Sequence, residues 1–231
     1  MNDGGERRYE RKFLIRHVPD ALVEHVVRLH PAQFSEIYHQ RHVNNCYFDT
    51  PGLRYFRDAV EGHSRRMKVR VRWYGDLLGA IRRPVLEIKG KHGLVGFKRQ
   101  FPLPPLALDR TSTLPSLADW LHGADASEEI AAAVGALGPT LLNRYSRRYF
   151  SCAGGPYRIT LDTQLEFYSV SPPRLRIPPD ASHELPARIL EIKYDESAED
   201  GIPHVTNHLP FRLTKSSKYV TGLQQLRHRL R

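Results

Sequence analysis

The sequence is poor in cysteine, in long apolar runs and in the motifs of common enzyme classes. Its two cysteines, Cys46 and Cys152, have no CxxC spacing, which argues against a disulfide framework or a cysteine-based zinc site and makes a reducing, cytoplasmic location the default expectation. No window approaches 18 apolar residues, and the first residues, MNDGGERRYERKF, lack an apolar run, so neither a transmembrane helix nor a signal peptide is expected. The absence of a GxxxxGK[ST] motif argues against an ordinary P-loop kinase.

Acidic residues are also in the minority. The chain has 25 Asp and Glu against 35 Lys and Arg, a net charge of +10 over 231 residues, which predicts a polyanionic partner. The hydrophobic fraction of 40% is sufficient for a core, and the length suits a single β-barrel domain. We expect residues 1–8 to be disordered and residues 9–231 to form one domain.

The most informative stretch is Met67–Tyr74, MKVRVRWY, which is typical of a β-strand. Because strand side chains alternate, Lys68, Arg70 and Arg72 share one face, and the apolar residues between them share the other. Two interpretations fit this strand alone: a sheet with one face in water, or a barrel with a polar lumen and helices packed outside.

Other segments repeat this pattern of charge on one face of a strand. At least six predicted strands place Lys, Arg or Glu in phase opposite apolar residues, often as Glu-x-Lys or Arg-x-Arg. We predict helices from Asp20 to about Leu29, over 52–59, 117–121 and 128–137, and at 217–230, with a proline-rich loop over 168–186. The other predicted strands are 9–15, 43–49, 84–91, 95–101, 142–151, 157–167 and 188–194.

This recurrence favours the barrel with a charged lumen. Two like charges ~6 Å apart at an effective dielectric constant of ~20 repel by about 3 kcal/mol, so clustered cations imply a neutralising anion. A linear phosphate chain fits a tunnel best, and in-phase glutamates would hold a divalent cation that neutralises further phosphate charge. The predicted fold class is therefore β-dominated α+β, an eight-stranded antiparallel barrel that forms a tunnel with flanking helices.

The ordered set of segments YERKFLI, KVRVRWYG, LEIKGK, GFKRQFPL, RITLDT, LEIKYD and TKSSKYVTG resembles the VTC domain, from Tyr9 to about Leu226. This is the polyphosphate polymerase domain of vacuolar transporter chaperones, in the CYTH/triphosphate tunnel metalloenzyme superfamily. The resemblance implies transfer of the ATP γ-phosphate to a polyphosphate chain with Mn²⁺ or Mg²⁺. It also implies a set of site residues. Expected in catalysis are Arg70, Arg72, Lys89 and Lys218, in phosphate binding Lys12, Lys68, Lys98, Arg144, Arg158, Lys215 and Ser217, and in metal binding Glu191, with Glu10 and Glu87 as further candidates by position.

Other interpretations stay open. A tunnel triphosphatase that hydrolyses inorganic or nucleoside triphosphate would use the same cations, and a non-catalytic polyanion-binding module would need them too. Nucleic acid is not expected as a partner, and a separate membrane protein would be needed for any translocation of product. Among the remaining residues, we interpret Lys91, Arg99 and Arg148 as solvated charges and Asp162 as a turn or pairing residue. Trp73 and Tyr74 are interpreted as packing residues.

Overall fold

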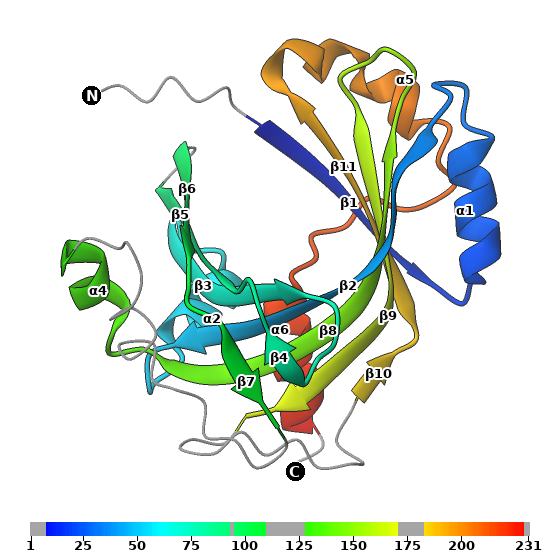
Figure 1. Cartoon of the computed structure of the whole chain (residues 1–231). Coiled ribbons are helices and arrows are strands. Elements are labelled where there is room, and N and C mark those ends of the chain that lie inside the picture. Colours follow the sequence, from blue (N-terminus) through cyan, green and yellow to red (C-terminus); the bar gives the residue numbers. More distant parts are fainter. Residues whose placement is uncertain (1–7, 93–94, 110–127, 171–182, 229–231) are drawn as a thin grey trace. The chain divides into compact units, whose positions relative to one another are not determined.

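The computed structural model describes residues 8–92, 95–109, 128–170 and 183–228 (Figure 1). Within these residues one large sheet has the hydrogen-bonded strand order β1-β11-β9-β8-β2-β3-β5-β6, and β10 pairs with β9. The strands are β1 Arg8–Arg16, β2 Ser35–Asp49, β3 Arg65–Tyr74, β5 Val85–His92, β6 Val95–Pro102, β8 Gly138–Ser151, β9 Arg158–Ser169, β10 His183–Leu185 and β11 Ala187–Asp195. The pairs β1/β11, β11/β9, β2/β3, β3/β5 and β5/β6 are antiparallel. The predicted fold class, a β-dominated α+β fold on eight principal antiparallel strands, is confirmed.

The chain divides into two compact units, and strands β2, β8, β9 and β10 contribute residues to both. Unit 1 comprises Met1–Arg41, Tyr145–Leu165 and Leu185–Ser216, and unit 2 comprises His42–Arg144, Glu166–Glu184 and Ser217–Arg231.

Unit 1 has its own apolar core, formed by alternate residues of its strands and one face of α1 (Asp20–Arg28). Val23 and Val27 of α1 are fully buried in the cluster that also contains Phe13, Ile159 and Leu190. Burying each such side chain stabilises the fold by roughly 1.5–3 kcal/mol. The short helices η1 (Glu196–Gly201) and α5 (Ile202–Thr206) complete this unit and were not predicted.

Helix α1 begins at Asp20, as predicted, and its N-cap residue Pro19 makes no side-chain capping hydrogen bond. The carboxylate of Asp20 accepts a hydrogen bond from Arg188 of β11, so this acidic group ties the helix to the sheet.

Unit 2 is built around a second core, which contains Val69, Val71 and Trp73 of β3, as the alternation of this strand predicts. Helix α2 (Arg54–Glu61) begins two residues later than predicted because Leu53 has a left-handed backbone, φ 54°. Helices α4 (Glu128–Val134) and α6 (Lys218–His228) also belong to this unit. Gly222 brings α6 close to the sheet, since a Cβ there would lie 2.5 Å from Phe167 and 2.7 Å from Leu141.

Several boundaries differ from the predictions for physical reasons. Strand β2 begins at Ser35, eight residues before the predicted start. The prediction missed residues 35–42 because they are mostly exposed and their sequence shows no apolar alternation. Strand β8 begins at Gly138, four residues before the predicted start, and the three-residue strands β4 (Gly79–Ile81) and β7 (Leu106–Leu108) were not predicted.

The predicted helix 117–121, residues 1–7 and most of the predicted loop 168–186 lie outside the described residues. Among the helices that the structure does describe, each is too short or too polar to cross a membrane.

Candidate functional site

In unit 2, three lysines from three neighbouring strands form one row across the sheet. Lys68 of β3 lies opposite Lys89 of β5, and Lys89 lies opposite Lys98 of β6. Residues directly opposite one another in antiparallel strands share a face, with Cβ atoms ~5 Å apart, so three like charges stand side by side. This arrangement destabilises an empty sheet and favours an anion that several ammonium groups contact together.

The same face continues along β3 on both sides of the lysine row. Arg66 lies opposite Lys91 at one end, and Arg70 lies opposite Glu87 at the other, followed by Arg72. We call this set, Arg66, Lys68, Arg70, Arg72, Lys89, Lys91 and Lys98, the cationic face of unit 2. Lys91, interpreted as a solvated charge, therefore shares the face of the predicted site, whereas Arg99 is on the opposite face of β6 from Lys98.

Glu87 lies on this face opposite Arg70 and is only 2% exposed. Arg70 donates to its Oε2 from Nε (2.7 Å) and Nη2 (2.5 Å), and Gln100 donates to Oε1 at 2.8 Å. Arg72 and Lys98 pair with Oε1 at 3.5 and 3.3 Å. Burial by itself raises the pKa of Glu87, but Arg70, Arg72 and Lys98 outweigh that effect and hold it well below its usual value.

Two buried asparagines orient Arg72. Arg72 Nε donates to Asn45 Oδ1 at 2.9 Å, and Asn45 Nδ2 donates to Asn143 Oδ1 at 2.9 Å. Because arginine only donates, this chain fixes the orientation of both amides and leaves Asn143 Nδ2 buried without a partner. Neither asparagine was singled out from the sequence. In the structure Asn45 of β2 lies opposite Arg72, and Tyr47, on the same face of β2, lies opposite Arg70.

The start of α6 is tied to the same unit by a buried hydroxyl. Tyr219 donates to Asp49 Oδ2 at 2.6 Å and stacks on Tyr47 with ring centroids 5.0 Å apart. Asp49 also accepts from the backbone N–H groups of Tyr55 and Phe56 at the start of α2. With α6 held in this way, Lys68 Nζ donates to Ser217 Oγ at 3.1 Å, and Lys218 is the first residue of α6.

Unit 1 carries a second charged face. Lys12 of β1 lies opposite Glu191 of β11, which lies opposite Thr160 of β9, and the next row is Glu10, Lys193 and Arg158. Lys12 Nζ is 3.0 Å from Glu10 Oε2 and 3.6 Å from Glu191 Oε2, and Lys193 Nζ is 2.9 Å from Glu191 Oε1. Burial lowers the pKa of Lys12, but Glu191 and Glu10 outweigh burial and raise it, so the ammonium stays charged.

A buried ion pair borders this face. Arg147 of β8 donates from Nε to Asp162 Oδ1 at 2.5 Å and from Nη2 to Oδ2 at 2.7 Å, and Asp162 is fully buried. Burial lowers the pKa of Arg147, whereas Asp162 raises it, and the net shift is upward. Asp162 thus has the pairing role that the sequence suggested. Arg147 was missed because Arg144 was chosen from the same arginine-rich segment; Arg144 lies on the opposite face of β8 from Asn143.

The two carboxylates of unit 1 fit a divalent cation better than Glu87 does. Glu10 and Glu191 already share one cation, the Lys12 ammonium, and the buried Thr160 Oγ1 in the same row has no hydrogen-bond partner. Oxygen ligands of this kind suit Mg²⁺ or Mn²⁺, which are commonly held by one or two carboxylates together with substrate phosphates. Glu87 is surrounded by three cations and Gln100, and these contacts include no second carboxylate, so we do not propose Glu87 as a ligand. Among the described residues no group of three or more His, Cys, Asp or Glu side chains could hold a metal.

The remaining predicted residues are more exposed. Arg158 in unit 1 is exposed at the start of β9, and Lys215 lies exposed in the segment before α6. Arg148 pairs with Glu24 at 2.9 Å and donates to Gln40, so it is a paired surface charge.

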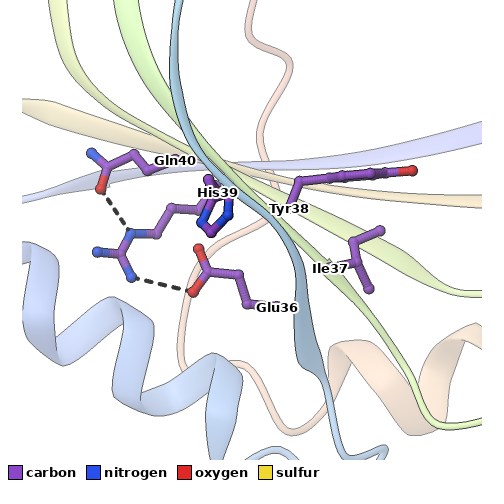
Figure 2. A pocket seen from close by; sticks show the side chains of 6 residues that line it. Glu36, Ile37, Tyr38, His39 and Gln40 are labelled. Carbon is purple, nitrogen blue, oxygen red and sulfur yellow. Dashed lines mark hydrogen bonds and ion pairs between the residues drawn. The ribbon is translucent and has the colours of Figure 1, made fainter.

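A hollow of about 610 Å³ in unit 1 is lined by Glu36, Ile37, Tyr38, His39, Gln40 and Arg148 (Figure 2). Its Glu36 is also paired, with Arg28 at 2.7 Å. Figure 2 shows Gln40 on one side of strand β2 and Tyr38 and Ile37 on the other, so an apolar and aromatic part of the hollow lies apart from its ion pairs.

Comparisons with known proteins agree with the fold. The model of the VTC domain family matches residues 7–227. The PH1819 protein of Pyrococcus horikoshii OT3 is similar in structure, with a TM-score of 0.50 and 12% identity over 94% of this chain and 99% of that one. A conserved hypothetical protein of Pyrococcus furiosus aligns with a TM-score of 0.51 and 12% identity over 93% of this chain and 99% of its own.

At these identities the likeness concerns the fold alone. A putative adenylyl cyclase from Hippeastrum, HpAC1, described as having a dominant triphosphatase activity, aligns with a TM-score of 0.49 and 13% identity over 94% of this chain and 96% of its own. No curated protein matches the sequence.

Proposed function

We propose that this chain, which belongs to the VTC domain family, transfers the γ-phosphoryl group of ATP to the end of a polyphosphate chain. In this reaction the bond between the γ-phosphorus and the β,γ-bridging oxygen breaks, and a terminal oxygen of the chain forms the new bond. ADP leaves with the electron pair of the broken bond. Such a transfer asks the protein for in-line positioning and charge stabilisation rather than for covalent chemistry.

The observation that carries the proposal is the cationic face of unit 2. Its cations occupy four successive rows along β3, from Arg66 with Lys91 to Arg72. With a rise of ~3.3 Å per residue, these rows extend over ~20 Å. That is longer than a triphosphate group, in which only two P–O–P links separate the terminal phosphorus atoms. A set of cations that extends this far along β3 favours a chain of phosphates as the ligand.

The side chains of this face have distinct tasks in the proposed reaction. Lys68, Lys89 and Lys98 act as adjacent point charges for phosphate oxygens, and Arg70 and Arg72 provide planar donors that stabilise charge on a transferring group. Glu87 holds both guanidinium groups against the strand, so that they are oriented before substrate binds. This preorganisation avoids reordering the arginines during transfer.

On the charged face of unit 1, Glu191 and Glu10 would hold a divalent cation, with the Thr160 hydroxyl as a further oxygen. When bound, the ion supplies positive charge that neutralises phosphate oxygens. Lys12 and Lys193 hold the two carboxylates in place and contribute charge of their own. Mn²⁺ or Mg²⁺ as the ion, the cytoplasm as the location and a separate membrane partner remain predictions.

The test is to incubate the purified chain with ATP and Mn²⁺ and to separate the products on a denaturing polyacrylamide gel. We expect a ladder of long polyphosphate together with ADP. Orthophosphate without polymer would instead identify a triphosphatase, and the absence of both products would leave a polyanion-binding module. A Lys89→Ala variant should lose most polymer formation, whereas Arg99→Ala, on the opposite face of the adjacent strand, should retain it.

A further inference from the structure

In unit 1, Tyr38, Arg41 and Tyr149 contact one another and form a group that we call the aromatic ladder. The guanidinium carbon of Arg41 is 4.8 Å from the ring centroid of Tyr149 and 5.4 Å from that of Tyr38. The two tyrosine rings meet edge to face with centroids 5.7 Å apart. On its inner side the ladder continues to Arg147, whose guanidinium carbon is 5.9 Å from the Tyr149 centroid. A single cation between two tyrosine rings is a surface on which a flat, electron-rich ring can stack.

Strand register places this ladder next to the charged face of unit 1. The register between β8 and β9 follows from two contacts. The Cys152 N–H donates to the Tyr157 carbonyl just beyond the strand ends, and Arg147 pairs with Asp162, each five residues from that hydrogen bond (152 − 147 and 162 − 157). The same register puts Tyr149 opposite Thr160, which in turn lies opposite Glu191. Tyr149 is therefore in one row with Thr160, Glu191 and Lys12, the residues that would bind metal and phosphate.

The outer end of the ladder is open to solvent. Tyr38 is 58% exposed and also lines the hollow of about 610 Å³, beside Ile37, which is 43% exposed. In Figure 2, Tyr38 and Ile37 point away from the side occupied by Gln40. In this part of the hollow, Tyr38 and Ile37 present an aromatic and an aliphatic surface apart from the ion pairs of Glu36 and Arg148.

We infer that the ladder of Tyr38, Arg41 and Tyr149 binds the nucleobase of the phosphoryl donor. The inference rests on the proposed function and names where its nucleotide substrate is held. The ligand that fits is a flat aromatic ring joined to a phosphate chain. The ring stacks on the exposed Tyr38, which is held by Arg41 and by its edge contact with Tyr149, and the phosphates reach the row of Thr160, Glu191 and Lys12. Inorganic polyphosphate has no such ring and makes no use of the ladder.

The test compares two ligands that share phosphates but differ in the base. Binding of ATP and of tripolyphosphate is measured by isothermal titration calorimetry for the wild type and for Tyr38→Ala. Stacking contributes enough per base that its loss weakens binding about fivefold or more. We expect this loss for ATP alone, with tripolyphosphate unchanged. Tyr38→Trp should restore ATP binding, because it restores a stacking ring.

Tyr74→Ala is the matched control, since Tyr74 is 49% exposed and belongs to unit 2. The inference is overturned if Tyr38→Ala binds ATP as the wild type does, or if both ligands are weakened equally. The measurement needs no turnover. Polymer formation with an unaffected Tyr38→Ala variant would overturn the nucleobase site alone, and selective loss of ATP binding in a protein that makes no polymer would overturn only the proposed function. A wild type that binds no ATP would overturn both.

Discussion

Arg70 and Glu87 form an ion pair in which both Nε and Nη2 of the arginine donate to one oxygen, Glu87 Oε2. The other oxygen of Glu87 faces Arg72, Lys98 and the amide of Gln100. One buried carboxylate therefore holds two arginines and a lysine in a fixed arrangement. A cationic face can persist without its ligand because this internal anion offsets part of the repulsion.

Glu87→Gln should destabilise the protein. Removing one partner of a buried ion pair costs roughly 3–5 kcal/mol, because the remaining cations lose their counter-charge. Thermal unfolding should show a lower Tm, and tripolyphosphate should raise the Tm of this variant more than that of the wild type, since the ligand replaces the lost anion.

The control for that variant is Glu61→Gln, which removes a half-exposed carboxylate of α2 that pairs with His63. It should leave both the Tm and the effect of tripolyphosphate unchanged. Equal stabilisation of Glu87→Gln and the wild type by tripolyphosphate would show that the ligand does not bind at this face.

Glu191→Gln tests the metal site. The variant keeps the size of the side chain but loses the charge that would bind a divalent cation, so activity should fall by more than about tenfold, which is at least the effect of removing a supporting residue of a metal site. Tripolyphosphate binding without metal should be retained. Polymer formation measured over a Mn²⁺ titration checks this.

Glu199→Gln is the matched variant, because Glu199 belongs to unit 1 but pairs with Arg11, on the opposite face of β1 from Lys12. It should respond to Mn²⁺ as the wild type does. An unchanged Mn²⁺ dependence in Glu191→Gln would contradict the assignment of this carboxylate.

Asn45→Ala tests whether the amide chain positions Arg72. Without the Asn45 acceptor, the Arg72 guanidinium keeps its ion pair with Glu87 but loses the hydrogen bond that holds its Nε. A small displacement of a catalytic group lowers kcat by about tenfold to a hundredfold. Circular dichroism and Tm identify any general loss of structure.

Asn44→Ala removes a neighbouring buried amide that bonds instead to the Gly75 and Asp76 carbonyls, on the opposite face of β2. We expect lower stability with little change in kcat per folded molecule. The positioning role of Asn45 is refuted if both variants lower kcat to the same extent.

His30 gives the expected pH dependence of stability. It is buried, with Nε2 against the Val205 carbonyl and Nδ1 accepting from the Ala32 N–H, an arrangement that requires the neutral ring. Burial lowers its pKa below the ordinary value, despite the Val205 carbonyl, and nearby His208 adds to this. As pH falls, His30 therefore takes up a proton in the unfolded chain at a higher pH than in the folded one. The free energy of unfolding is thus greatest above about pH 6.5 and decreases as pH drops below that value.

Nuclear magnetic resonance of the imidazole should show His30 titrating below about pH 6.5, the ordinary value for histidine. Tm measured between pH 7 and pH 5 should fall more in the wild type than in His30→Gln. A His30 that titrates above pH 6.5 would contradict the neutral ring assignment.

Strands with one apolar and one charged face could be predicted from the sequence, because alternation determines which residues are buried. In β3 the order Lys68, Arg70, Arg72 against Val69, Val71, Trp73 was sufficient to assign both faces. The first half of β2 could not be predicted in this way, since residues 35–42 are exposed along most of their length and lack that contrast.

The partners of each charge were harder to predict than its face. Glu87 was expected as a metal candidate from its phase, but its surroundings depend on Arg70, Lys98 and Gln100, which register alone brings together. Arg144 and Arg147 lie in one arginine-rich segment, and only the contact with Asp162, fifteen residues from Arg147, distinguishes them. Asn45 and Asn143, 98 positions apart, give no signal in the sequence that they touch.

The position of a radioactive label decides whether the phosphoryl group moves from ATP into a polyphosphate chain. Two reactions, one with ATP labelled at the γ-phosphorus and one with ATP labelled at the α-phosphorus, are resolved side by side after incubation with Mn²⁺. We expect the γ-label to enter long polyphosphate and the α-label to remain in ADP and unreacted ATP, with none in the polymer. A γ-label found entirely in orthophosphate would contradict it.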